Sequence, residues 1–126
     1  MSNKMLRYIL SFILGLSSLL AVSACGNEST VDTLNDGEIY FFYQTTCPHC
    51  HDAAKYIKNK YPQLKMVSID VRRGNNMDLF RQAVEKYNID GSTGTPLITF
   101  EKDYIMGWSE GEKRRFDTLV QPYLQQ

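Results

Sequence analysis

The sequence predicts an α/β domain in which a mixed four-stranded sheet has helices on both faces. Short apolar runs of strand length alternate with longer segments whose apolar residues recur at helical spacing. The order strand, helix, strand requires a parallel, right-handed crossover. A later pair of short apolar runs, separated by three polar residues, indicates an antiparallel hairpin before a final helix. The predicted order is therefore β-α-β-α-β-β-α.

The first half of the domain contains two predicted strands and the helix between them. Residues 38–43 are short, apolar and aromatic, which indicates a buried strand. A helix is predicted over residues 48–60, because Pro48 suits a first helical turn and Pro62 prevents the helix from continuing. The alternating pattern of residues 64–71 predicts the second strand.

The second half adds two helices and the hairpin. Asn75 or Asn76 is a suitable cap for the first of these helices. The expected elements are a helix over residues 77–87, a loop over 91–94, strands over 97–100 and 104–106 with a turn at 101–103, and a final helix over 110–124.

The first 24 residues have the layout of a secretory signal. Lys4 and Arg7 form a positive region, residues 6–20 are almost wholly apolar, and small residues precede Cys25. The apolar run is shorter than the roughly 20 residues that a transmembrane helix needs. The segment Val22-Ser23-Ala24-Cys25 resembles a bacterial lipobox, in which the cysteine is lipidated and becomes the new N-terminus. The alternative is an ordinary signal that is cleaved nearby and leaves Cys25 as a free thiol.

We therefore expect three parts in this chain of 126 residues. A lipoprotein signal peptide covers residues 1–24, a polar, flexible tether anchored by lipid at Cys25 covers 25–37, and one folded domain covers 38–126. The expected location is the extracytoplasmic side of a membrane, in a periplasm or at the cell surface. Three cysteines are an odd number for an exported protein, and lipidation of Cys25 would leave one pair.

The charge of the chain suggests no strongly charged partner. Lysine and arginine together number 14, as do aspartate and glutamate, so the formal net charge is zero. A nucleic-acid-binding protein would be expected to present a basic patch. The short basic runs at Arg72-Arg73 and at residues 113–115 are interpreted as solvated surfaces, and nucleic acid is not an expected partner.

The candidate catalytic residues lie where the first predicted strand passes into the first predicted helix, in the run Cys47-Pro48-His49-Cys50. A Cys-x-x-Cys that follows a buried strand and opens a helix is a redox signature. The helix N-terminus has unpaired N–H groups and partial positive charge, so we expect it to stabilise a thiolate at Cys47. His49, between the cysteines, can add a hydrogen-bond donor or a positive charge. Cys47 would attack a disulfide and Cys50 would resolve the mixed disulfide.

These residues resemble the thioredoxin superfamily in its glutaredoxin-sized form. The Cys-Pro-His-Cys run has the dipeptide of Dsb-type disulfide oxidases, and Thr95-Pro96 is similar to the family's cis-proline site. That resemblance implies a thioredoxin-like fold, with Thr95 and Pro96 facing the cysteines and pairing with bound substrate. Residues 96–110 are similar to the glutaredoxin pattern of proline, strand, turn, strand, glycine and acidic helix start.

Two positions depart from the family pattern. Thioredoxins and Dsb oxidases have a buried acid six residues before the first cysteine, and this chain has Phe41 there. Glutaredoxins commonly have a lysine three residues before that cysteine, and this chain has Gln44. The first departure removes the usual proton acceptor of Cys50. The second argues against glutathione as a substrate.

Several other interpretations stay open from the residues alone. His51 completes a Cys-x-x-Cys-His pattern, which also attaches c-type haem, and the same cysteines and histidines could bind copper or zinc. The pair could be a structural disulfide, or the domain an inactive thioredoxin-like adaptor. Trp108 could be a recognition aromatic, although packing at a helix start is the expected role.

The favoured function is a thiol–disulfide oxidoreductase that acts on protein thiols and disulfides outside the cytoplasm. Its expected active residues are Cys47, Cys50 and His49, with Thr95 and Pro96 for substrate, and it needs no cofactor and no metal. The Pro-His dipeptide favours the oxidant direction. The small domain also allows a membrane partner that exchanges electrons with the pair.

Overall fold

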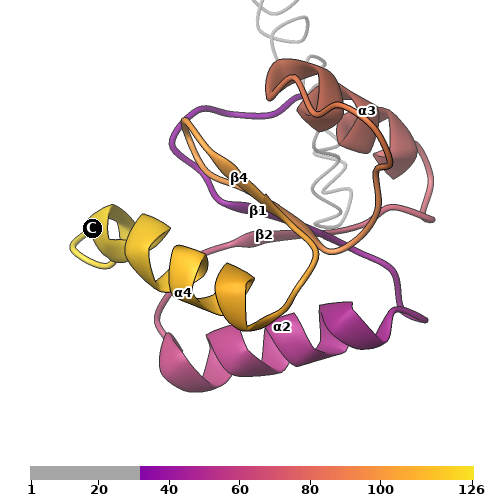
Figure 1. The fold of residues 1–126 in the computed structure, drawn as a ribbon. Coiled ribbons are helices and arrows are strands. Elements are labelled where there is room, and N and C mark those ends of the chain that lie inside the picture. The colour runs from indigo at the N-terminus through magenta and orange to yellow at the C-terminus, as the bar shows by residue number, and fades with distance from the viewer. Residues whose placement is uncertain (1–31) are drawn as a thin grey trace, which may run out of the picture. The chain divides into compact units, whose positions relative to one another are not determined.

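Four strands form one mixed sheet, and their order confirms the predicted α/β class. The computed structural model describes residues 32–126 (Figure 1). The sheet has the order β2-β1-β3-β4, with β1 and β2 parallel and the other pairs antiparallel. The elements are β1 Tyr40–Tyr43, α2 Pro48–Lys60, β2 Val67–Asp70, α3 Asn76–Lys86, β3 Leu97–Thr99, β4 Tyr104–Met106, α4 Glu110–Leu119 and a short 3₁₀ helix, η1, Gln121–Tyr123.

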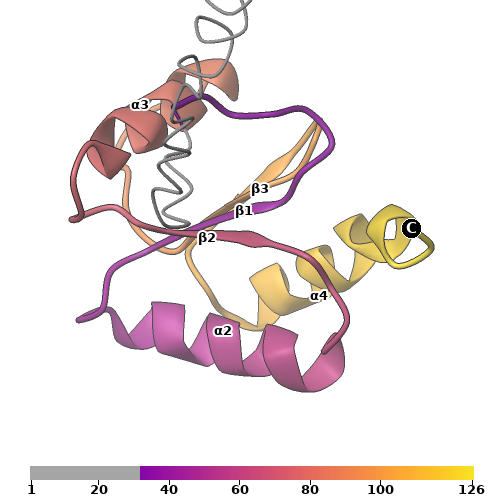
Figure 2. The same ribbon diagram turned by 180° about the vertical axis from the view of Figure 1, so that it is seen from behind.

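The residues of β1 alternate between two hydrophobic cores. Ile39 and Phe41 pack with α2 and α4 on one face of the sheet, and Tyr40 and Phe42 pack with α3 on the other. Figures 1 and 2 show this layering, with α2 and α4 below the sheet and α3 above it. Because side chains of a strand point alternately to opposite faces, a continuous apolar run is what a strand covered on both sides requires.

Two element boundaries differ from the sequence prediction by three residues or more. The second strand was expected from residue 64, but β2 starts at Val67, because the backbone N–H of Leu64 donates to the Tyr61 carbonyl at 3.0 Å and closes a turn. The final helix was expected to run to residue 124, but α4 ends at Leu119 and η1 follows. Pro122 lacks a backbone N–H and cannot continue the α-helical hydrogen bonds.

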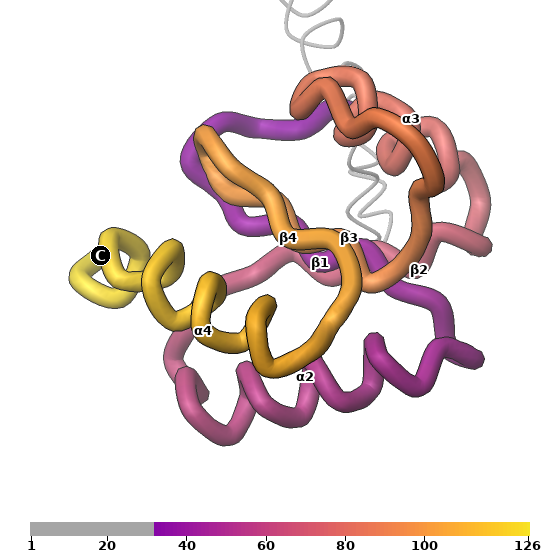
Figure 3. Tube along the Cα trace, viewed as in Figure 1, coloured from indigo at the N-terminus to yellow at the C-terminus, as the bar shows by residue number. Residues whose placement is uncertain are grey.

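The β3–β4 hairpin leads directly into α4 (Figure 3). Gly107 lies between β4 and α4 with φ of +83°, a backbone conformation that suits glycine. Its N–H donates to the carbonyl of Pro96 at 2.9 Å. Ser109 caps α4, with its hydroxyl oxygen accepting from the backbone N–H of Gly111 at 3.3 Å.

Residues 32–37, the described end of the predicted tether, make contacts with the domain. Asp36 forms an ion pair of 2.6 Å with Lys86 of α3, and half-buried Leu34 packs against the α3-side core. The backbone N–H of Asn35 donates to the Tyr40 hydroxyl at 2.7 Å. The signal peptide and Cys25 lie outside the described residues. Within residues 32–126, none of the helices has the length and apolar character needed to cross a membrane.

Candidate active site

The cysteine pair lies where β1 passes into α2. Cys47 is the N-cap of α2, with extended backbone angles of φ −95° and ψ 109°, and Pro48 is the first helical residue. The N–H of Cys47 donates to the Gln44 carbonyl at 3.2 Å, which closes the preceding loop. The N–H of His51 donates to the Cys47 carbonyl, also at 3.2 Å, and begins the helical hydrogen bonds. Local sequence signals therefore place both cysteines at the helix start.

The two sulfurs are bonded as a disulfide and differ in accessibility. The Cα atoms of Cys47 and Cys50 are 5.2 Å apart, within the usual range for a disulfide. Cys50 is only 1% exposed and lies in the core with Ala53 and Ile57, whereas Cys47 is half-buried at its edge. A reagent or substrate from solution therefore meets the Cys47 sulfur first.

The surroundings of Cys47 favour negative charge on its sulfur. The backbone N–H of Cys50 donates to Cys47 Sγ at 3.1 Å. The first turn of α2 has no acidic residue, and its last turn has two basic residues, Lys58 and Lys60. No carboxylate in the first turn therefore opposes the positive end of the helix macrodipole near the sulfur.

The predicted proline site is brought to the cysteines by the fold. The Thr95–Pro96 peptide bond is cis, which confirms that prediction. The Thr95 carbonyl oxygen lies 3.6 Å from Cys47 Sγ, although the two residues are 48 positions apart. Pro96 is buried and Thr95 is half-buried, so the accessible sulfur lies beside the backbone that enters β3.

The two histidines next to the cysteines have different surroundings. His49 is exposed and makes no side-chain hydrogen bond within the described part of the chain. His51 is also exposed, but its Nε2 lies 2.7 Å from the carbonyl oxygen of Thr45. The role of Thr45 was not predicted, because a backbone carbonyl gives no signal in the sequence.

The structure also shows the surroundings of Phe41 and Gln44, the two positions that depart from the family pattern. Phe41 is 4% exposed and belongs to the same core as Cys50, so an aromatic ring replaces the acid near the second sulfur. Gln44 is half-buried, and its Oε1 accepts from Nε of Arg72 at 2.8 Å. Arg72 was interpreted only as a solvated residue. Arg72 is exposed, yet its hydrogen bond holds the side chain of Gln44 in the loop before Cys47.

Trp108 is packed, as expected. Its ring is 7% exposed and meets Tyr56 and Phe116 edge-on, with centroid separations of 5.6 Å and 6.0 Å. Within the described residues its indole N–H has no hydrogen-bond partner. The ring therefore joins α2 to α4 below the sheet.

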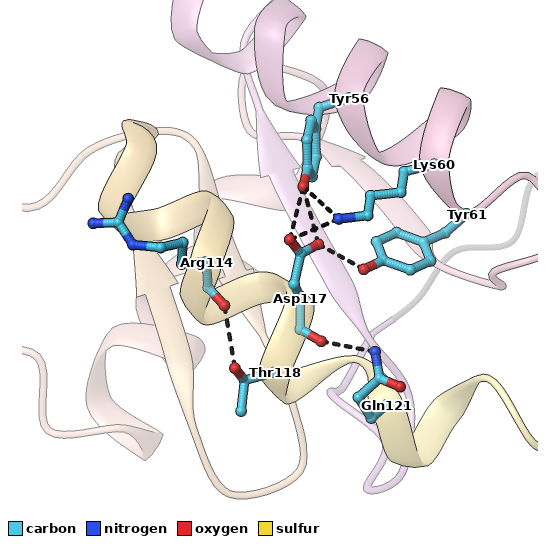
Figure 4. A network of polar contacts seen from close by, with 7 residues as sticks. All are labelled: Tyr56, Lys60, Tyr61, Arg114, Asp117, Thr118 and Gln121. Carbon is cyan, nitrogen blue, oxygen red and sulfur yellow. Dashed lines mark hydrogen bonds and ion pairs between the residues drawn. The ribbon is translucent and has the colours of Figure 1, made fainter.

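A polar network holds the second half of α2 against α4 (Figure 4). Asp117 of α4 accepts hydrogen bonds from the hydroxyls of Tyr56 and Tyr61, at 2.8 Å and 2.6 Å, and from Lys60 at 2.8 Å. The network had no counterpart in the sequence analysis, because its partners lie more than 50 residues apart. It fixes the direction of the helix that begins with the cysteines.

The pKa values of the network follow from its contacts. Burial would raise the pKa of Asp117, but the hydrogen bonds that it accepts outweigh burial and hold its pKa below the ordinary value. The hydrogen bond to Asp117 raises the pKa of Lys60. Burial, together with the hydrogen bond to Asp117, raises the pKa of Tyr61 to about 12. At neutral pH the carboxylate, the ammonium and the phenol are thus all in the forms that bind one another.

Fold and site together define the class of the domain. Residues 32–126 form a thioredoxin-like domain of glutaredoxin-like layout, with a Cys-x-x-Cys disulfide at the start of α2 and a cis-proline beside it. Over the same residues, no group of three or more His, Cys, Asp or Glu side chains could hold a metal ion.

Comparison with known proteins agrees with this fold. The crystal structure of the glutaredoxin Grx-1 from Archaeoglobus fulgidus is similar, with a TM-score of 0.50 and 18% sequence identity. The similarity covers 68% of this chain and 87% of the glutaredoxin. No protein-family model and no curated protein matches the sequence.

Proposed function

We propose that this protein is a thiol–disulfide oxidoreductase of protein substrates, and that Cys47 is its nucleophile and Cys50 its resolving cysteine. The unequal burial of the two cysteines is the observation on which the proposal rests. Cys47 is half-buried at the N-terminus of α2, whereas Cys50 is 1% exposed in the core. A disulfide that only stapled the fold would need no such difference.

The reduction of a substrate would take two exchange steps. The Cys47 thiolate attacks one sulfur of the substrate disulfide, which forms a mixed disulfide and releases one substrate thiolate. The Cys50 thiolate then attacks Cys47 Sγ, which releases the second substrate thiolate and forms the Cys47–Cys50 disulfide. The substrate gains two electrons and the cysteine pair loses two. Both released thiolates take protons from solvent.

The oxidation of a substrate dithiol reverses these steps, and we propose that it is the working direction. A substrate thiolate attacks Cys47 Sγ of the disulfide, and Cys50 leaves as a thiolate. A second substrate thiolate then displaces Cys47. A helix N-terminus that stabilises the Cys47 thiolate also favours the reduced pair, which makes the disulfide a stronger oxidant. His49, exposed between the cysteines, would add a donor or a positive charge to that thiolate.

The proposal places this chemistry outside the cytoplasm. Cys25 would be lipidated and would hold the domain at the extracytoplasmic side of a membrane, where a membrane partner would restore the disulfide. Thr95 and Pro96 would bind the substrate backbone beside Cys47, since the Thr95 carbonyl lies 3.6 Å from its sulfur.

The contact of His51 favours this function over haem binding. A haem attached through Cys47 and Cys50 would take a His51 ring nitrogen as its axial ligand. Here Nε2 of His51 lies 2.7 Å from the Thr45 carbonyl, and the two sulfurs are bonded to each other. Haem attachment would have to break both interactions.

The reduction potential of the pair tests the proposal most directly. Equilibration of the full chain with glutathione redox buffers should give roughly −120 to −200 mV, and a value near the thioredoxin potential, about −270 mV, would overturn the oxidant direction. Cys47→Ser should abolish the oxidation of a reduced, unfolded protein substrate. Cys50→Ser should instead trap a mixed disulfide when the same protein is supplied in its disulfide form, because the Cys47 thiolate attacks that disulfide and no Cys50 thiolate resolves the product. Unchanged substrate oxidation by the Cys47→Ser protein would overturn the enzyme proposal as a whole.

A further inference from the structure

The loop before Cys47 is held by two side chains from outside the loop. At its start, Arg72 donates to Oε1 of Gln44 at 2.8 Å. One residue further on, the carbonyl of Thr45 meets Nε2 of His51 at 2.7 Å. Thr45 and Thr46 are both exposed, so side-chain burial does little to hold this part of the loop. The position of Cys47 as N-cap therefore depends on polar contacts.

The position of His51 on α2 explains how its ring reaches the loop. Residue 51 lies four positions after Cys47, and residues at i and i+4 lie on the same face of a helix. Helical side chains also lean towards the N-terminus of the helix, here towards the loop. Because a carbonyl oxygen can only accept, Nε2 of His51 must carry the proton and donate to Thr45.

We propose that His51 is a positioning residue for Cys47, which holds the Thr45 carbonyl so that the Cys47 sulfur stays at the α2 N-terminus. In that position Sγ accepts from the Cys50 N–H at 3.1 Å and lies 3.6 Å from the Thr95 carbonyl. Loss of the His51 contact frees the loop, and the thiolate loses part of its stabilisation. The inference rests on the proposed function, since it assigns the role to the nucleophile of that reaction.

Three substitutions at this position separate the hydrogen bond from the charge and the ring. The Gln side chain places its amide nitrogen near Nε2, so His51→Gln retains a donor to Thr45. The Asn side chain is one methylene shorter and its amide nitrogen lies near Nδ1, so His51→Asn is polar but does not reach the carbonyl. His51→Ala removes the donor entirely. Lys58→Ala, at an exposed residue in the last turn of the same helix, is the control.

The readout is the rate at which iodoacetamide alkylates reduced Cys47 at pH 6, in the full chain with Cys25→Ser. We expect His51→Ala and His51→Asn to react about three to ten times more slowly, the factor that one hydrogen bond represents. The midpoint of their alkylation profile should also move to higher pH. His51→Gln should stay within about twofold of the parent, since it keeps that hydrogen bond, and Lys58→Ala should match it.

Two results would overturn the inference. One is alkylation of Cys47 at the parental rate in all three His51 variants, which would mean that the contact does not position the sulfur. The other is a His51→Gln protein as slow as His51→Ala, which would assign the effect to the imidazole itself. Alkylation needs no substrate, so failure of the parent chain to oxidise a protein dithiol would refute the proposed function and leave this test intact.

Discussion

Asp117→Ala should lower the free energy of unfolding by about 2 kcal/mol at pH 7. The Asp117 carboxylate accepts from the hydroxyls of Tyr56 and Tyr61, at 2.8 Å and 2.6 Å. A hydrogen bond to a charged group contributes roughly 1.5 to 3 kcal/mol. Because the Asp117 side chain is 29% exposed, water competes, and we take about 1 kcal/mol for each phenol. The ion pair with Lys60 adds nothing to this sum, since the Lys60 side chain is half exposed.

Urea unfolding followed by fluorescence measures this loss. Trp108 is the single tryptophan and packs against Tyr56, next to the network. The melting temperature should fall by about 10 °C, given about 4 to 8 °C per kcal/mol for a domain of this size. Asp36→Ala is the matched control. It breaks the 2.6 Å ion pair with Lys86, but Asp36 is 81% exposed, so the loss of stability should be much smaller than that of Asp117→Ala.

The acid side of the stability curve gives a second test of the same network. The pKa of Asp117 is lower in the folded than in the unfolded chain, so its contribution is fully present above the unfolded value, about 3.9. It is lost as pH falls through the folded value. The difference between wild type and Asp117→Ala should therefore shrink below about pH 4. The reasoning is refuted if Asp117→Ala costs no more than Asp36→Ala at pH 7, or if its cost persists at pH 2.

Two further predictions concern Tyr61 and Phe41. Because burial and the hydrogen bond to Asp117 raise the pKa of Tyr61 to about 12, the stability from its neutral phenol should be present below about pH 10 and lost as pH rises towards 12. Tyr61→Phe should therefore reduce the pH dependence of the free energy of unfolding, measured with urea, between about pH 10 and pH 12. An unchanged pH dependence would count against the assignment. Phe41→Asp should cost at least about 3 kcal/mol, because it leaves a cavity and buries a carboxyl beside Cys50. The loss should be larger at pH 8 than at pH 5, and equal losses would show that the carboxyl is not buried.

The elements that the sequence predicts well are those with local causes. The bounds of α2 agree with the prediction at both ends, because Pro48 starts the helix and the chain turns at Pro62. The burial of β1 follows from its aromatic run. Of the two larger boundary errors, only one has a local cause. The break in α4 could have been predicted from Pro122, whereas the late start of β2 depends on pairing with β1, in which Val67 lies opposite Tyr40.

By itself the sequence determined the fold class and the redox pair, because hydrophobic periodicity and the Cys47–Cys50 spacing act over a few residues. The resemblance to the thioredoxin superfamily predicted that Thr95 and Pro96 face that pair, and tertiary structure decided which atoms make the long-range contacts. The Thr95 carbonyl reaches Cys47 from 48 residues away, and Asp117 meets Tyr56 across 61 residues. The contact between His51 and Thr45 depends on the path of one loop. Such contacts join backbone atoms and side chains that no sequence pattern relates, so they become visible only once the sheet has brought α2, β3 and α4 together.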